Sequence, residues 1–367
     1  MEYPFETLTI NKREIRLRDI QQGTVSSHTA FESDTFSFIR QWMSDVHEFT
    51  FQTSGSTGDP KIIVFSRDQL IQSALATIDA LELKAGDAAL VCLNTKYVAG
   101  KMMLIRAFVN NMRIIAAEPS SNPFRDIRIN QPIDFVALVP LQLETILKEG
   151  FQNRLNMIKK IIIGGAAIHT ELKSAIENTL HTDVYATYGM TETISHIALQ
   201  KIHPDINFFS ALPDVKIQPD DRGCLVIKIP YVKESVVTND LVQFLSENTF
   251  KWLGRIDHVI NSGGIKVIPE KVEAALETIF AQLNVSQKFL VAGIPDKILG
   301  SKVILLLEGT PLPSTTETAF FKEAATTLEK VEIPKQIITV AEFKLTQSGK
   351  IDRRGIVEEF LSRGYNS

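Results

Sequence analysis

The sequence predicts an α/β protein with a large N-terminal domain, built on a mostly parallel sheet with a small antiparallel subdomain, and a C-terminal α+β domain. Strand-like apolar runs alternate with helical patterns over residues 48–186, which indicates a parallel sheet covered by helices. Short alternating runs continue to residue 253, a pattern typical of hairpins. After Pro269 the chain reads helix, two strands and helix, in a unit of roughly a hundred residues, a usual domain size.

Length and composition are those of a soluble globular enzyme. The 367 residues, 44% hydrophobic and 22% charged, suit roughly two or three domains. The net charge of -4 provides no basic footprint for nucleic acid. No apolar run reaches the ~18 residues of a membrane span, and the acidic start differs from a signal peptide. We therefore expect a cytoplasmic protein with no nucleic-acid partner and no membrane span.

Cysteine and histidine usage predicts neither a structural zinc site nor a redox motif. Cys92 and Cys224 fall in separate predicted strands and have neither metal-binding nor redox spacing, so buried free thiols are the favoured interpretation. The seven histidines are scattered, without a Cys/His cluster. A structural zinc site is therefore not expected.

Individual elements follow from apolar spacing and cap signals. Near the start we expect a strand at residues 8–10, a helix at 36–43 and a strand at 48–52. Ser66 and Gln69 form a plausible capping box, and apolar residues at helical spacing then predict a helix to residue 81. Further strands are expected at 88–93, 113–117, 135–139, 160–163, 183–186, 216–217, 225–229, 236–242, 249–253, 289–292 and 302–307, and helices at 101–109, 141–148, 171–178, 269–280 and 319–328.

A hydroxyl- and glycine-rich loop closed by a lysine occupies residues 51–61. Its glycines let backbone N–H groups face an anion, its hydroxyls add donors, and the lysine adds a compact positive charge. The loop therefore suits a polyphosphate, although its composition alone also allows a flexible surface loop. It is not a Walker loop, because Pro60 precedes the lysine and Ile62 follows it. The residues concerned are Thr53, Ser54, Gly55, Ser56, Thr57, Gly58 and Lys61.

Two more motifs follow predicted strands, where the ligands of a parallel sheet bind. After residues 160–163 come Gly164, Gly165 and Ala166, whose small size would let a flat ring approach the backbone; an ordinary turn is the alternative. After residues 183–186 comes Thr-Tyr-Gly-Met-Thr-Glu, at 187–192. A carboxylate there suits Mg²⁺, which is bound by one or two carboxylates plus phosphate oxygens.

Three signals follow in the second half of the chain. The first is Thr-Asn-Asp-Leu at residues 238–241. The second is Gly-Arg-Ile-Asp-His at 254–258, and the third is Leu-Thr-Gln-Ser-Gly-Lys-Ile-Asp-Arg at 345–353. Turn or linker chemistry explains the composition of each one alone, but it does not explain their order.

Taken in order, these motifs resemble those of the adenylate-forming superfamily, which includes acyl- and aryl-CoA synthetases, luciferases and the adenylation domains of peptide synthetases. The resemblance runs from about residue 51 to the end. It implies that the 53–61 loop binds the phosphates of ATP. It also implies that Tyr188 stacks on adenine, that the Thr191 hydroxyl meets the α-phosphate and that Glu192 holds Mg²⁺. Other residues of the implied nucleotide site are Gly164, Gly165, Ala166, Gly189 and Met190.

The resemblance also implies where the ribose binds. Asp240 would accept from both ribose hydroxyls, and Arg255 would also reach the ribose. Asn239 stands where the family has glycine. The departure is mild, because asparagine adopts positive φ more readily than most residues.

The resemblance further implies a mobile C-terminal domain. Asp257 would be the hinge, and Gly263 and Gly264 would lie where the pantetheine of coenzyme A passes. Lys350 would reach the substrate carboxylate and the α-phosphate during adenylation. The domains are expected at residues 1–256 and 257–367.

Two features depart from the family pattern. Only fifty residues precede the phosphate loop, so the chain looks like a form with a shortened front. Similar short chains occur among the o-succinylbenzoate–CoA ligases of menaquinone synthesis, which residues 188–197 also resemble. In addition, Tyr97 stands in the acyl pocket where many relatives carry histidine.

The subgroup resemblance implies a substrate with a second carboxylate. We expect a donor or cation near a strand at residues 188–197 to anchor it, because burying an unpaired carboxylate is costly. Ser195 and His196 are the first candidates. Lys96, Lys101 and Arg106 follow them.

The implied activity is that of an ATP-dependent acid–CoA ligase that forms an acyl-adenylate, with ATP, Mg²⁺ and coenzyme A at one site. A general aryl- or fatty-acyl-CoA synthetase, an inactive AMP-binding relative and an ATPase or kinase are the alternatives. Incubation with ATP and candidate acids, followed by identification of the nucleotide product, separates a ligase, an inactive relative and an ATPase or kinase. The exact acid and the oligomeric state, a homo-oligomer included, stay open.

Overall fold

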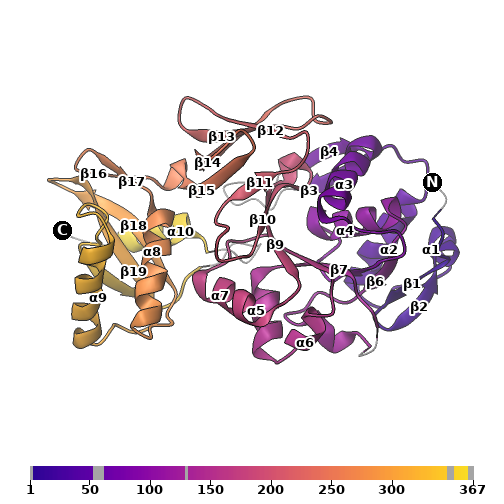
Figure 1. Cartoon of the computed structure of the whole chain (residues 1–367), viewed down its shortest axis with the longest axis horizontal. Helices are drawn as coiled ribbons and strands as arrows, with labels where there is room; N and C mark the ends of the chain where they lie inside the picture. The colour runs from indigo at the N-terminus through magenta and orange to yellow at the C-terminus, as the bar shows by residue number, and fades with distance from the viewer. Residues whose placement is uncertain (1–2, 53–61, 129–130, 345–350, 363–367) are drawn as a thin grey trace.

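The computed structural model describes residues 3–52, 62–128, 131–344 and 351–362. In these residues the chain forms a 13-stranded sheet, a 5-stranded sheet and a separate 2-stranded hairpin. Figure 1 shows the larger sheet and its helices toward the N-terminal end of the colour scale, and the smaller sheet with its own helices, orange to yellow, beside them. The predicted fold class is confirmed.

Five parallel strands form the centre of the large sheet: in spatial order they are β6 (Arg113–Ala116), β5 (Ala88–Val91), β7 (Phe135–Leu138), β8 (Lys160–Ile163) and β9 (Asp183–Gly189). Alternate residues enter two cores: Ala89 and Val91 join one, and Ala88 and Leu90 the other. Both faces are therefore buried, which explains why these strands read as continuous apolar runs.

Helices supply the rest of the two cores. The Ser66 capping box is confirmed: Ser66 Oγ accepts from Gln69 N at 3.2 Å, and Gln69 Oε1 accepts from Ser66 N at 2.8 Å. One core includes residues of α1 (Leu17–Gln22), α2 (Ala30–Trp42), α3 (Arg67–Leu81) and α4 (Val98–Val109), and the other includes residues of α5 (Pro140–Lys148), α6 (Gln152–Leu155) and α7 (Thr170–Thr179).

The antiparallel strands continue the same sheet beyond β9: in spatial order they are β10 (His196–Lys201), β11 (Phe209–Ala211), β15 (Thr249–Arg255), β14 (Val236–Phe244), β13 (Cys224–Lys228) and β12 (Lys216–Pro219). The expected antiparallel subdomain is thus present and is hydrogen-bonded to the parallel part through β9 and β10.

The opposite end of the sheet is closed by β1 (Thr7–Ile10), parallel to β6, and β2 (Arg13–Arg16). The short edge strand carries three charged residues, which discourages pairing with another chain. A separate hairpin joins β3 (Glu48–Gln52) and β4 (Ile62–Ser66). The predicted phosphate loop lies between them, outside the described residues.

The C-terminal part of the chain builds the second sheet. The chain passes from β15 to this sheet through a 3₁₀ turn, η3 (Ile256–His258). The strands are β16 (Ile260–Ser262), β17 (Ile265–Val267), β18 (Phe289–Asp296), β19 (Gly300–Glu308) and β20 (Ile337–Val340), and the helices are α8 (Pro269–Gln282), α9 (Ser314–Thr327) and α10 (Arg353–Ser362).

Most expected elements are found within a few residues of their predicted ends, but the single strand at residues 188–197 is wrong. There the chain ends β9, makes a 3₁₀ turn, η2 (Thr191–Thr193), and begins β10. Cys92 and Cys224 are buried free thiols, as expected. In the described ranges no helix has the length and apolar character required to cross a membrane.

Candidate functional site

Glycines follow β8 where the side chain of Thr187, near the end of β9, approaches the backbone. A Cβ at Gly164 would overlap Thr187 Oγ1, and Gly165 adopts a positive φ of 88°. Thr187 Oγ1 donates to the Ile163 carbonyl at 3.1 Å, which ties the two strand ends together. A larger residue at position 164 would therefore displace the Thr187 hydroxyl from this bond, at the edge where a parallel sheet binds its ligands.

Tyr188 lies near the end of β9 and bonds directly to Asp240 of β14. Its hydroxyl donates to Asp240 Oδ2 at 2.5 Å. Its ring packs edge-on against Phe250, with centroids 5.3 Å apart, and also contacts Phe209. Burial and the Asp240 charge raise the pKa of Tyr188. The tyrosine is therefore a neutral donor held in one orientation by two aromatic neighbours.

Asp240 is buried, with 8% of its surface exposed. Arg255, its register partner on β15, places Nη1 3.7 Å from Asp240 Oδ1. The same guanidinium donates to Asp257 Oδ2 at 2.5 Å through Nη2. The two predicted ribose residues therefore lie together, and Arg255 is shared with the predicted hinge.

Beyond β9, the chain turns sharply through Thr191, Glu192 and Thr193. Ile194 is fully buried and has φ 68° and ψ -50°, and Ser195 N donates to the Thr193 carbonyl at 2.7 Å. This is a γ-turn in a sparsely populated region, and positive φ is a genuine outlier for a β-branched residue. Thr193, which is fully buried, stabilises it: Met190 N donates to Thr193 Oγ1 at 2.9 Å, and this oxygen lies 2.7 Å from the Ser195 carbonyl oxygen. Backbone strain of this kind is concentrated at functional sites.

The turn sets Ser195 and His196 directly opposite Gly189. His196 pairs with Gly189 in the β9–β10 register, and a Cβ at position 189 would overlap His196 Cα. Only glycine fits there without moving β10. The predicted nucleotide residues and the predicted substrate residues are thus neighbours across one strand pair.

Behind Ser195 lies a buried arginine from α4. Arg106 Nη2 donates to Ser195 Oγ at 2.5 Å, whereas Arg106 Nε is buried without a hydrogen-bond partner. Arg106 is only 2% exposed, and within the described ranges no carboxylate forms an ion pair with it. Since buried charges are normally paired, this guanidinium is the outstanding polar feature of the region.

His196 is buried beside this cation. Its Nε2 lies 3.2 Å from Thr77 Oγ1, and its Nδ1 lies 3.5 Å from Ser195 Oγ. Burial, reinforced by the Arg106 charge, lowers the pKa of His196 well below 6.5. Burial likewise lowers the pKa of Arg106 to about 10, so at neutral pH the arginine is charged and the histidine is neutral.

The other substrate candidates lie on or beside α4. Tyr97 is the N-cap residue of α4 and is 43% exposed, and Lys96 is also exposed. Lys101 Nζ lies 5.0 Å from the Phe51 ring centre and 3.4 Å from the Thr50 carbonyl, and burial lowers its pKa. Gly100 is required because a Cβ would overlap the backbone at Asn94.

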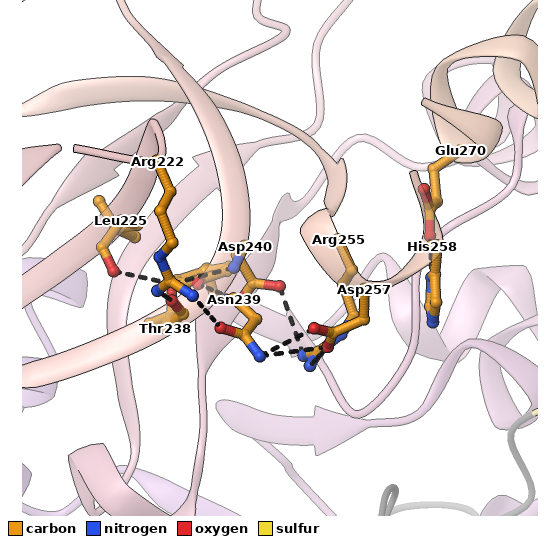
Figure 2. Close-up of polar contacts among 10 residues, drawn as sticks. Arg222, Leu225, Thr238, Asn239, Asp240, Arg255, Asp257, His258 and Glu270 are labelled. Atoms are coloured by element: carbon orange, nitrogen blue, oxygen red, sulfur yellow. Dashed lines mark hydrogen bonds and ion pairs between the residues drawn. The ribbon is translucent and has the colours of Figure 1, made fainter. Parts of the chain in front are cut away.

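Only some of the remaining predicted site residues belong to the described part of the chain. Gly263 and Gly264 form the turn between β16 and β17, with φ of 58° and 81°. Asp257 lies in η3 with Arg255 and Asn239 around it, as Figure 2 shows. The predictions for residues 53–58, Lys61 and Lys350 lie outside the described residues.

Glu192 is the predicted magnesium ligand. It is exposed beside the end of β9, and the described residues contain no cluster of three or more metal-binding side chains. A single accessible carboxylate fits Mg²⁺, which keeps water and phosphate oxygens as its other ligands. The residues present therefore suit a metal that arrives with a nucleotide.

Sequence reasoning missed several residues that shape the site. The γ-turn has no local signal, because nothing in the sequence predicts positive φ at an isoleucine. The aromatic neighbours of Tyr188 come from distant strands. The residues missed are Thr77, Thr193, Ile194, Phe209, Arg222 and Phe250.

The fold and these residues define a nucleotide-binding α/β protein. The family described as AMP-binding enzyme matches residues 49–221. A solved structure, the acyl-CoA synthetase (AMP-forming)/AMP-acid ligase II-like protein from Dyadobacter fermentans, is 35% identical with a TM-score of 0.61; the match covers 92% of this chain and 97% of that one. The chain belongs to the AMP-binding enzyme family.

Further relatives carry more specific names. The 2-succinylbenzoate–CoA ligase of Staphylococcus aureus strain bovine RF122 is 25% identical over 383 aligned positions, which cover 96% of this chain and 75% of the relative. The o-succinylbenzoate coenzyme A synthetase of Bacillus subtilis, solved in complex with ATP and magnesium, has a TM-score of 0.70 and is 22% identical, over 83% of this chain and 68% of that one. The second likeness is one of fold.

The low pKa of His196 predicts a specific pH dependence of stability. Between pH 6.5 and the lower pKa of the folded state, only the unfolded chain binds a proton at this residue, so stability falls as pH falls. From pH 7.5 to 5.5, the wild type should lose more unfolding free energy than His196→Gln, by up to about 1.4 kcal/mol. Urea denaturation at both pH values measures the difference. An exposed control, His181→Gln, should not change the wild-type pH dependence, and equal slopes for wild type and His196→Gln would contradict the prediction.

Proposed function

We propose that this protein is an ATP-dependent acid–CoA ligase that acts through an acyl-adenylate, with o-succinylbenzoate as its acid. Membership of the AMP-binding enzyme family and the names of the relatives support the reaction type. The observation that carries the choice of acid is the buried, unpaired guanidinium of Arg106 behind Ser195. A second candidate is an aryl- or fatty-acyl-CoA synthetase, for which a buried cation has no evident use.

The proposed nucleotide site is centred on the end of β9. Adenine would lie against Tyr188, with Gly164, Gly165 and Ala166 on its other side and Gly189 and Met190 at its edge. The ribose hydroxyls would donate to Asp240, which the Tyr188 hydroxyl already orients. Thr191 would donate to the α-phosphate, and the 53–58 loop with Lys61 would hold the outer phosphates.

Magnesium, when bound, would be held by Glu192 and would neutralise negative charge on the phosphates. The substrate carboxylate would attack the α-phosphorus in line, with pyrophosphate as the leaving group. The protein's own part is positioning and electrostatic stabilisation, by Thr191 and by Lys350, more than covalent chemistry. The thiolate of coenzyme A would then displace AMP from the acyl-adenylate.

The second carboxylate of the substrate would bind at Ser195. This residue is half-buried. Its hydroxyl oxygen accepts from Arg106, and with His196 Nδ1 as the donor to the same oxygen its proton would be available to the substrate. Arg106 would compensate the charge from behind, in a region where desolvation strengthens the attraction. His196 would stay neutral, held by Thr77 through Nε2, and would orient Ser195 through Nδ1. Tyr97 would line the acyl pocket at the start of α4.

The proposed domains are residues 1–256 and 257–367, joined at Asp257. The passage of the chain between two separate sheets at η3 supports this division. After adenylation the C-terminal domain would rotate about Asp257, which withdraws Lys350 and brings Gly263 and Gly264 to the site. The proposed location is the cytoplasm, where thiols such as Cys92 and Cys224 stay reduced.

Product analysis tests the reaction. With ATP, Mg²⁺, coenzyme A and o-succinylbenzoate, the protein should release AMP and pyrophosphate in equal amounts and form the acyl-CoA thioester. Chromatography of the nucleotides together with mass spectrometry of the thioester measures both. Release of ADP would identify an ATPase or kinase, and no turnover with any acid would favour an inactive relative.

Arg106 should discriminate between acids with and without a second carboxylate. For the wild type, kcat/KM for o-succinylbenzoate should exceed that for benzoate by at least about 10², as expected when an unpaired buried group is the alternative. In Arg106→Gln that ratio should fall by about tenfold or more, since the buried charge is lost. A matched control on the same helix, Lys101→Gln, should keep most of the ratio. A wild-type ratio near one would rule out this assignment of the acid.

Lys350 should serve the first half-reaction alone. The described residues on either side of position 350 have their own contacts: Asp352 N donates to the Lys344 carbonyl at 2.8 Å, and Arg353 pairs with Glu273 at 2.6 Å. Lys350→Ala should therefore leave the fold intact and slow ATP–pyrophosphate exchange by about 10²–10³, the loss typical of one preorganised donor. Single-turnover transfer from supplied acyl-adenylate to coenzyme A should be unaffected. Equal losses in both assays would contradict the domain rotation.

A further inference from the structure

The side chain of Asn239 bridges two charged groups beside the connection between the sheets. Asn239 Nδ2 donates to Asp257 Oδ1 at 3.0 Å and to Oδ2 at 3.2 Å, and Asn239 Oδ1 accepts from Arg222 Nη1 at 2.9 Å. Figure 2 shows the amide between the guanidinium and the carboxylate. The opposite amide orientation is excluded by chemistry, because it would place a carbonyl against a carboxylate and an NH₂ group against a guanidinium.

The large-sheet side of this bridge is fixed. Arg222 Nε donates to Asp220 Oδ2 at 2.9 Å, and Nη2 donates to the Thr238 carbonyl at 2.9 Å. Thr238 is itself buried, and its hydroxyl donates to the Leu225 carbonyl at 2.7 Å. Asn239 therefore offers its amide from within β14, a strand paired on both sides, with little side-chain freedom left to lose when it binds a carboxylate.

The other side of the bridge lies in the connection between the two sheets. Asp257 lies in η3, the connection between the large sheet and the second sheet. Its carboxylate has two partners from the large sheet, Arg255 and Asn239. Although burial raises the pKa of Asp257, these two hydrogen bonds and the Arg255 charge outweigh burial and lower it. The carboxylate is thus ionised in this arrangement, which makes both hydrogen bonds charge-assisted.

We infer that Asn239 is a positioning residue that latches the connection between the two sheets in the orientation seen here. A rotation about Asp257 that carried its carboxylate away from β14 would break the bonds from Asn239. A glycine at position 239, as in the family pattern, has no side chain to make them. This chain therefore has an additional interaction that favours one domain orientation, and the ribose residue Asp240 is the next residue along the same strand.

The latch concerns the orientation of the two domains, which can be measured without turnover. Only its effect on the reaction rests on the proposed function. Energy transfer between two dyes measures that orientation without turnover. Suitable exposed positions are Asn153 in α6 and Ala325 in α9, each replaced by cysteine. The native Cys92 and Cys224 are both 0% exposed and will not compete for label.

In the doubly labelled protein without ligands, Asn239→Ala should reduce the population of the orientation seen here by about three- to tenfold relative to the alternative, as expected for loss of a partly exposed charge-assisted hydrogen bond. Asn239→Gly should give the same shift and carries the test if the alanine variant does not fold. Gln243→Ala is the matched control, since it removes an exposed amide from the same face of β14. It should leave the energy-transfer distribution unchanged.

The thermal unfolding midpoint separates a latch from a general stabilising role. The midpoint of Asn239→Ala should stay within a few degrees of the wild type while the energy-transfer distribution shifts. If the distributions of wild type, Asn239→Ala and Gln243→Ala coincide, the inference is overturned. A protein that makes no acyl-CoA but still shows the shift would refute the proposed function and leave the latch standing.

Discussion

The site depends on the antiparallel pairing of β9 with β10, where the sheet stops being parallel. To make this pairing, the chain reverses within a few residues through the γ-turn at Ile194. Strain of that kind costs on the order of 1–3 kcal/mol. Two features stabilise the strained turn: the buried Thr193 hydroxyl accepts from Met190 N, and Gly189 has no side chain to obstruct β10. The same reversal brings the proposed nucleotide residues and the proposed substrate residues to adjacent strands, so one strained turn positions both sets.

A second constraint is the cation buried behind that turn. An ionised group without a partner is expensive to bury, and the usual response is a shift in pKa. The pKa of Arg106 falls, yet at about 10 it still leaves the side chain charged at neutral pH. Ser195 and the Met103 sulfur accept from it, but neither carries charge. The protein therefore maintains an unfavourable arrangement that a bound anion would relieve, which is the form of preorganisation expected at a binding site.

How much could be predicted from the sequence depended on the range of the interaction involved. The parallel strands and the α3 capping box follow from neighbouring residues, and both were predicted. The order of the motifs also allowed the proximity of Tyr188 and Asp240 to be anticipated. By contrast, the contact between Arg106 and Ser195 forms only in the folded chain, because the two residues are 89 positions apart in the sequence. The reversal at Ile194 went unpredicted because it contradicts the residue's own preference, so local reasoning extended a strand through it. Such conflicts between local preference and fold are expected at functional sites.

Arg255 connects the two halves of this arrangement. Its Nη2 lies 2.5 Å from Asp257, whereas its Nη1 lies 3.7 Å from Asp240, beyond hydrogen-bond length. One guanidinium can serve both carboxylates, but its fork cannot align with both at once. Ribose hydroxyls that donate to Asp240 would reduce the pull of that carboxylate on Arg255, since its charge would be shared with new donors. Arg255 would then bind Asp257 more tightly. By this reasoning a bound nucleotide would strengthen the contacts of the proposed hinge carboxylate, and its departure would weaken them. Occupancy of the proposed ribose site and the orientation of the C-terminal part would then be coupled through a single side chain.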